Sequence, residues 1–218
     1  MTAKDCTIIF DFDGTLVDSF GLALKISNAL APVFGFRMVE EHEVSQFRTL
    51  SLREIMRRLE IPAPMLPLVL ARGRTEMMKD ITSVHLFEGI PALLERIKAQ
   101  GLRMGIVTSN TRRTVLQSLR HHRVDALFDF VHSATNLFGK HRVLSRVLKK
   151  QHLQHHHIIY VGDEVRDVEA SRRCRIPVAA VTWGFQSRCQ LQTAGPDFLA
   201  DTPEELATYI ADCAAALP

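Results

Sequence analysis

The chain has 218 residues, of which 46% are hydrophobic and 23% are charged, and its net charge is +3 with histidine neutral. This composition is enough for one large globular domain, or for a core with a small insertion. The mild positive charge would help to attract an anionic small molecule but is too weak for a nucleic-acid-binding surface, and no apolar run approaches the ~20 residues that cross a bilayer.

Short apolar runs alternate with amphipathic helical patterns along most of the chain. The run at 6–10 is almost continuously apolar, as expected for a parallel strand that is buried on both faces. The alternation predicts an α/β fold, a doubly wound parallel sheet with helices on both faces. The predicted strands are residues 6–10, 102–107, 128–132, 158–161, 178–182 and 198–199.

The stretch from 17 to 84 breaks this alternation because its patterns are helical only. Helices are predicted at 22–34, from Ser51 onward and at 65–81, and Ser51 with Glu54 forms a capping box. A helical block inserted directly after the first strand predicts a separate cap over the carboxyl edge of the sheet. The predicted domains are therefore a core of residues 1–16 and 85–218 and a helical cap of residues 17–84.

Asp11 and Asp13 follow the first strand at its carboxyl end, where open α/β sheets bind their ligands. Two carboxylates at this spacing can hold a hard cation, while one attacks phosphorus and the other donates and accepts a proton. Gly14 permits a tight turn that brings backbone amides to a phosphate. An Asp-Gly pair is also a common turn signal, so this motif alone leaves a purely structural role open.

Two further segments carry phosphate-binding chemistry. The Thr108 hydroxyl and the amides of Ser109 and Asn110 can bind phosphate oxygens, with a helix cap as the alternative. The Lys140 amine can keep a nearby aspartate ionised and offset phosphoryl charge, with a solvated surface lysine as the alternative.

An acidic segment follows the fourth predicted strand. Magnesium prefers oxygen ligands, and Asp163 at the strand end is the expected direct ligand. Asp167, four residues later, would hold metal-bound water or Lys140. An acidic helix start that matches the helix dipole would explain the same residues structurally. The sequence does not decide whether Glu164 or Asp167 is the second acidic residue of the metal site.

These segments together resemble the haloacid dehalogenase superfamily, in the branch with a small helical cap to which phosphoglycolate phosphatases belong. The resemblance rests on Asp-Phe-Asp-Gly-Thr-Leu-Val-Asp-Ser at 11–19 and Gly-Asp-Glu-x-x-Asp at 162–167, with Thr108 and Lys140 between them in the family's order. It covers essentially the whole chain. Many relatives have proline after the lysine, where this chain has His141.

The resemblance implies that Asp11 forms an aspartyl-phosphate and that Asp13 is the general acid and then the general base. It also implies that magnesium binds Asp11, the Asp13 carbonyl and Asp163, and that Thr108 and Lys140 steady the phosphoryl group. Dehalogenase members lack the second aspartate of the first motif, so Asp13 argues against carbon–halogen chemistry.

The remaining basic residues have weaker signals. Consecutive side chains at 155–157 point in different directions and match no closed zinc site, so these three histidines are expected to be solvated. Arg72, Arg74 and Lys79 are expected on a solvated face of the cap. Arg48 lies just before the capping box, and we expect it to contact the substrate.

The sequence therefore predicts a magnesium-dependent phosphatase that acts on a small phosphorylated metabolite, a phosphoglycolate-like monoester, without nucleic-acid or membrane partners. One alternative is a sugar-phosphate mutase of the same fold, which would need cap groups that hold a bisphosphate intermediate. Another is a regulatory protein that keeps the fold without turnover, against which the complete set of acids and Lys140 speaks.

The cellular setting follows from weaker signals. The amino terminus has no basic stretch followed by an apolar signal core, and the four scattered cysteines lack CxxC spacing. We expect a cytoplasmic protein with reduced thiols, either a monomer or a dimer.

Overall fold

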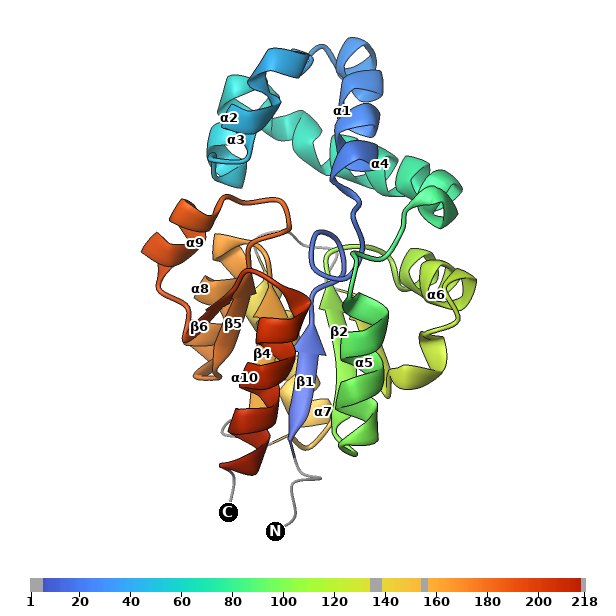
Figure 1. The fold of residues 1–218 in the computed structure, drawn as a ribbon. Coiled ribbons are helices and arrows are strands. Elements are labelled where there is room, and N and C mark those ends of the chain that lie inside the picture. Colours follow the sequence, from blue (N-terminus) through green and yellow to red (C-terminus); the bar gives the residue numbers. More distant parts are fainter. Residues whose placement is uncertain (1–5, 134–138, 154–156, 217–218) are drawn as a thin grey trace.

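The computed structural model describes residues 6–133, 139–153 and 157–216. Six parallel strands form one sheet in the order β3-β2-β1-β4-β5-β6 (Figure 1). The chain order reverses between β1 and β4, and sheets of this class bind ligands at that switch point. The predicted α/β fold is thus confirmed. The strands are β1 (Thr7–Phe10), β2 (Arg103–Thr108), β3 (Phe130–Ser133), β4 (Ile158–Gly162), β5 (Val178–Val181) and β6 (Phe198–Ala200).

Helices cover both faces of this sheet because successive strand residues point to opposite sides. Ile8 and Phe10 of β1 belong to an apolar cluster with three helices on one face, whereas Ile9 belongs to a cluster with three helices on the other. The first face carries α5 (Ile90–Ala99), α6 (Arg112–His121) and α10 (Pro203–Ala215). The second face carries α7 (Lys140–Lys150), α8 (Val165–Cys174) and α9 (Arg188–Ala194).

A helical segment between β1 and α5 lies beyond the carboxyl ends of the strands (Figure 1). It has an apolar cluster of its own, built around Ile26, Leu30, Phe47 and Leu59. The predicted helical insertion is therefore present, although its exact boundaries stay a prediction. Its elements are α1 (Phe20–Phe34), α2 (Val44–Phe47), α3 (Leu52–Arg58) and α4 (Leu66–Asp80), with 3₁₀ turns at Glu41–Glu43, Ala63–Met65 and Ile81–Ser83.

Two connections join this helical cap to the sheet, and they are hydrogen-bonded to each other. The Asp18 amide donates to the His85 carbonyl at 3.0 Å, and the Phe87 amide donates to the Leu16 carbonyl at 3.1 Å. Val17 forms an isolated antiparallel bridge with Leu86. Movement of the cap would therefore bend both connections at the same place.

Some elements differ from the sequence prediction. Strand ends shift by one or two residues, and Thr108 is the last residue of β2 rather than the residue after it. Helix α9 has no predicted counterpart because only Leu191 of its seven residues is buried, which gives no apolar stripe. None of the helices in the described part of the chain has the length and apolar character that a bilayer crossing requires.

Candidate active site

Three buried carboxylates meet at the switch point of the sheet. Asp11 directly follows β1, Asp163 directly follows β4, and Asp167 lies in the first turn of α8. Each is at most 1% exposed, and one carboxylate oxygen of each lies within 4.8 Å of the others. The predicted convergence of these aspartates is therefore observed, and the register of β1 against β4 produces it.

Asp163 is fixed from two sides. The Thr15 hydroxyl donates to Oδ1 at 2.7 Å, and the Phe185 amide donates to Oδ2 at 2.8 Å. Gly14 has φ +75, and a Cβ there would lie 2.2 Å from Asp163 Oδ2. Only glycine fits both this backbone conformation and this approach, so the predicted tight turn at Gly14 is present and also makes room for the carboxylate.

Lys140 lies inside this cluster rather than on the surface, so the alternative of a solvated lysine is wrong. It is the first residue of α7, is 4% exposed, and donates from Nζ to Asp11 Oδ2 at 2.5 Å and to Asp167 Oδ1. Burial lowers the pKa of Lys140, but the charges of Asp11 and Asp167 outweigh it, and the net pKa is raised. The amine therefore stays protonated between two carboxylates.

The Asp13 carboxyl group points away from that cluster. It accepts hydrogen bonds from Ser19 Oγ at 2.9 Å and from Asn110 Nδ2 at 3.0 Å. Burial, followed by the charge of Asp11, raises the pKa of Asp13 to about 6, although Ser19 and Asn110 oppose the shift. A carboxyl group that titrates near neutral pH suits proton transfer. Its backbone carbonyl as a metal ligand stays a prediction.

The loop after β2 lies beside Asp13. Thr108 is fully buried, and its hydroxyl accepts a hydrogen bond from the Asn110 amide at 3.0 Å. Helix α6 is capped instead by Thr111, whose hydroxyl accepts from the Thr114 amide, so the helix-cap alternative for Thr108 is wrong. Ser109 and Asn110 line the same cavity as Asp13, where their phosphate-binding role remains a prediction.

The two acidic residues that the sequence leaves undecided have different surroundings. Asp167 joins the buried cluster, and its Oδ2 accepts from the Glu164 amide at 3.1 Å. The Glu164 carboxylate turns away and accepts from Arg166 Nε at 2.5 Å. Burial raises the pKa of Asp167 to about 6, although Lys140 lowers it. The geometry therefore favours Asp167 over Glu164 beside a metal ion.

A cavity of about 360 Å³ lies between the cap and this cluster. The core contributes Asp13, Asn110 and Arg166 to its lining, and the cap contributes Arg74 from α4. The remaining walls are mainly apolar and include Phe20, Leu24, Met56 and Phe185. An apolar enclosure of this kind limits water access to the polar side chains that line it.

The cap arginines divide between the surface and the cavity. Arg72 ion-pairs with Glu76 on the surface as expected, but Arg74 lines the cavity, so the solvated prediction is wrong for it. Side chains two positions apart on a helix point in very different directions. Arg48 donates to the Gly184 carbonyl at 2.8 Å and lies over the Phe20 ring at 4.3 Å. Its expected substrate contact stays a prediction, and its observed contacts link the cap to the core.

His157, the last residue of the histidine run, lies at the opposite end of the sheet from the acidic cluster. His155 and His156 fall outside the described residues. His157 precedes the amino end of β4 and is only 5% exposed, so the expectation of a solvated side chain is wrong for it.

Several site residues are missed by sequence reasoning. Thr15 and Ser19 lie within the first motif, and small hydroxyl residues just after Asp11 and Asp13 are the signal that could have found them. The position of segment 183–185 after the fifth predicted strand suggests that it lines the same cleft, but no residue pattern reveals the contact of the Phe185 backbone amide with Asp163. Arg166 is visible only as one basic residue between Asp163 and Asp167.

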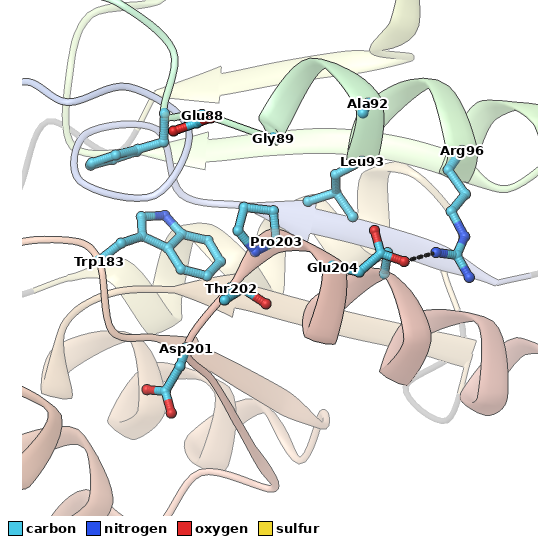
Figure 2. Close-up of a pocket in the computed structure, with 12 residues that line it drawn as sticks. Glu88, Gly89, Ala92, Leu93, Arg96, Trp183, Asp201, Thr202, Pro203 and Glu204 are labelled. Carbon is cyan, nitrogen blue, oxygen red and sulfur yellow. Dashed lines mark hydrogen bonds and ion pairs between the residues drawn. The ribbon is translucent and has the colours of Figure 1, made fainter.

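A second cavity lies between α5 and α10, as Figure 2 shows. Trp183, Pro203 and an ion pair of 2.6 Å between Arg96 and Glu204 line it. Asp13, Asn110 and Arg166 line the first cavity, whereas neither they nor the clustered aspartates line this one. We therefore place the active site at the switch point and not in this groove.

Comparison with known families agrees with this geometry. Residues 8–181 match the family model described as haloacid dehalogenase-like hydrolase. The chain belongs to this family. A phosphoglycolate phosphatase from Synechococcus elongatus is 38% identical over 199 residues, which cover 91% of this chain and 94% of that protein. The chain is thus a phosphatase-type hydrolase.

More distant relatives also match over almost the whole chain. The pyrophosphatase PpaX of Bacillus anthracis is 24% identical over 209 residues, covering 94% of this chain and 96% of that protein. The crystal structure of a predicted phosphatase from Clostridium acetobutylicum superposes with a TM-score of 0.83 at 23% identity, covering 95% of this chain and 98% of that one. The likeness to that structure therefore extends over almost the whole fold.

Proposed function

We propose that this enzyme is a magnesium-dependent phosphatase that hydrolyses a small phosphate monoester through an aspartyl-phosphate at Asp11. The observation that carries the proposal is the buried cluster of Asp11, Asp163 and Asp167 with Lys140 between two of them. Carboxylates are rarely buried without a partner of opposite charge, and this group has more negative than positive members.

The cluster fits a magnesium ion. Its three carboxylates supply only oxygen ligands, which magnesium prefers, and Lys140 neutralises only part of their charge. Burial raises the pKa of Asp163 well above its ordinary value, as expected for a carboxylate whose charge lacks a nearby cation. When bound, the ion would offset charge on the phosphoryl oxygens.

The chain's own residues divide the reaction between them. Asp11 would attack phosphorus, with the Phe12 amide holding its Oδ1 at 2.8 Å and Lys140 holding its Oδ2. Asp13, with its raised pKa, would protonate the leaving oxygen and then take a proton from the water that hydrolyses the aspartyl-phosphate. Thr108 would steady the phosphoryl group, and the paired connections near Val17 would let the cap close.

The relatives support a compact substrate. The names of the Synechococcus and Bacillus proteins refer to phosphoglycolate and pyrophosphate, and both compounds carry a second negative group close to the phosphorus. We propose a phosphoglycolate-like monoester for this chain, which would make its partner a small phosphorylated metabolite in the cytoplasm.

The direct test is phosphate release from a panel of phosphorylated metabolites. We expect efficient hydrolysis of one or two compounds with magnesium, loss of activity with EDTA, and recovery when magnesium is returned. Release that needs a bisphosphate primer would favour a mutase. No release from any compound by folded protein would contradict the proposal, as would activity that persists in EDTA.

Magnesium should also stabilise the fold, and more so at neutral than at acidic pH. The pKa of Asp167 rises from 3.8 to about 6 on folding, so the metal-free protein loses stability as the pH rises between these values. A magnesium ion requires ionised carboxylates, so its stabilisation, about 2.7 kcal/mol at a hundredfold excess over Kd, should be present at neutral pH and shrink near pH 5.

Thermal unfolding with and without magnesium measures this effect. Asp163→Asn should remove most of the gain in Tm, whereas Asp125→Asn, on the distant turn before β3, should leave it intact. An equal gain in both variants would contradict the metal assignment.

A further inference from the structure

Two guanidinium groups line the cavity above the catalytic aspartates. Arg74 comes from α4 of the cap, and Arg166 comes from the first turn of α8 in the core. Asp13 lines the same cavity. The proposed reaction gives roles to Asp13 and its neighbours but none to either arginine, so the position of these two charges needs its own explanation.

Each arginine is held close to the reacting groups. Arg74 Nε donates to the Ser109 carbonyl at 3.2 Å, which fixes this cap side chain against the loop after β2. Arg166 donates from Nε to Glu164 at 2.5 Å and pairs with the same carboxylate through Nη2. The contacts that the described residues make with Arg166 thus involve one edge of the guanidinium and leave Nη1 out.

The two positive charges act on each other across the cavity. Burial, and after it the charge of Arg166, lowers the pKa of Arg74. The Glu164 carboxylate, which also lines the cavity, offsets part of the Arg166 charge, and an anion bound between the two guanidinium groups would offset the repulsion that remains. The mainly apolar walls strengthen such an interaction because they exclude water from it.

We propose that Arg74 and Arg166 form an anion subsite that binds a second negatively charged group on the substrate's leaving group. This inference rests on the proposed phosphatase function and names its substrate class: a compact ester with a carboxylate or a phosphate close to the phosphorus under attack. Guanidinium groups suit either anion because their planar N–H donors match its oxygens in pairs. Because Arg74 belongs to the cap and Arg166 to the core, an anion bound by both would join the two parts of the protein.

Because the cavity walls are mainly apolar, the competing hypothesis is that the leaving group is apolar. Matched substrates distinguish an apolar leaving group from an anionic one. Phosphoglycolate and ethyl phosphate have the same carbon chain and differ in the carboxylate, while pyrophosphate offers a phosphate in its place. The measurement is kcat/KM for each compound in the wild type, in Arg74→Ala and in Arg166→Ala. Arg72→Ala is the matched control, since Arg72 lies on the same helix but pairs with Glu76 on the surface.

We expect the ratio of kcat/KM for phosphoglycolate over ethyl phosphate to fall about tenfold or more in each arginine variant, because each removes a charge-assisted contact. The ratio should stay unchanged in Arg72→Ala. An equal fall in the ratio of kcat/KM for pyrophosphate over ethyl phosphate would show that the subsite takes either anion. A fall in the ratio for only one of the two compounds would identify the anion that the subsite binds.

An unchanged ratio in both arginine variants would overturn the subsite, as would ethyl phosphate being the better substrate of the wild type. If the wild type hydrolyses no monoester, the proposed function fails separately. Calorimetric binding of phosphoglycolate to the wild type and to Arg74→Ala then still tests the subsite, and equal affinities would overturn it.

Discussion

Replacing Asp11 with asparagine should lower phosphate release about a thousandfold or more, because an amide cannot replace the attacking carboxylate. The change is nearly isosteric, and the side-chain oxygen can still accept a hydrogen bond from the Phe12 amide. Lys140 loses one of its two carboxylates but keeps Asp167. We therefore expect a folded protein without turnover, which separates the chemical role of Asp11 from a structural one.

Asp18→Asn is the matched control for this experiment. Asp18 is seven residues from Asp11, and its side chain is exposed beside the cap connections. It should retain wild-type turnover. Circular dichroism establishes that both variants are folded, and mass spectrometry after rapid quenching should find phosphate on Asp11 in the wild type. Near-wild-type hydrolysis by Asp11→Asn would rule out this nucleophile.

The positions of the central acids follow from the sequence because they depend on short-range signals. β1 and β4 are mainly apolar, which predicts buried parallel strands, and parallel strands bring their carboxyl ends to one edge. Asp11 and Asp163 follow those ends directly. The role of Lys140 is predicted in a different way, from its place in the order of the motifs along the chain.

Residues whose role depends on the cap are less predictable. The orientation of α4 about its own axis decides that Arg72 faces solvent while Arg74 faces the cavity, and that orientation is set by packing against α1. Arg48 illustrates the same limit, because its partner is a carbonyl 136 positions away in the chain. Such contacts arise only when the cap and the core are placed against each other.

Replacing Lys140 with methionine should impair both turnover and stability. Methionine fills much of the same volume but leaves Asp11 and Asp167 buried without their shared amine. Breaking one side of a buried ion pair typically costs about 3 to 5 kcal/mol. Turnover should fall about a hundredfold or more, because the charge beside the nucleophile is lost. Lys150→Met, at the exposed end of the same helix, is the control and should change neither.

The pH dependence of this loss distinguishes an electrostatic cause from a packing defect. In Lys140→Met a proton on one of the two carboxylates can replace the missing positive charge, so the deficit in unfolding free energy should be large at neutral pH and shrink as the pH falls toward 5. Urea denaturation at both pH values measures it. A deficit that does not change with pH would show that volume and packing, rather than charge, make Lys140 necessary.

Magnesium should restore part of the stability that Lys140→Met loses, because the ion neutralises the two carboxylates. It should not restore turnover, because it does not replace the amine beside the nucleophile.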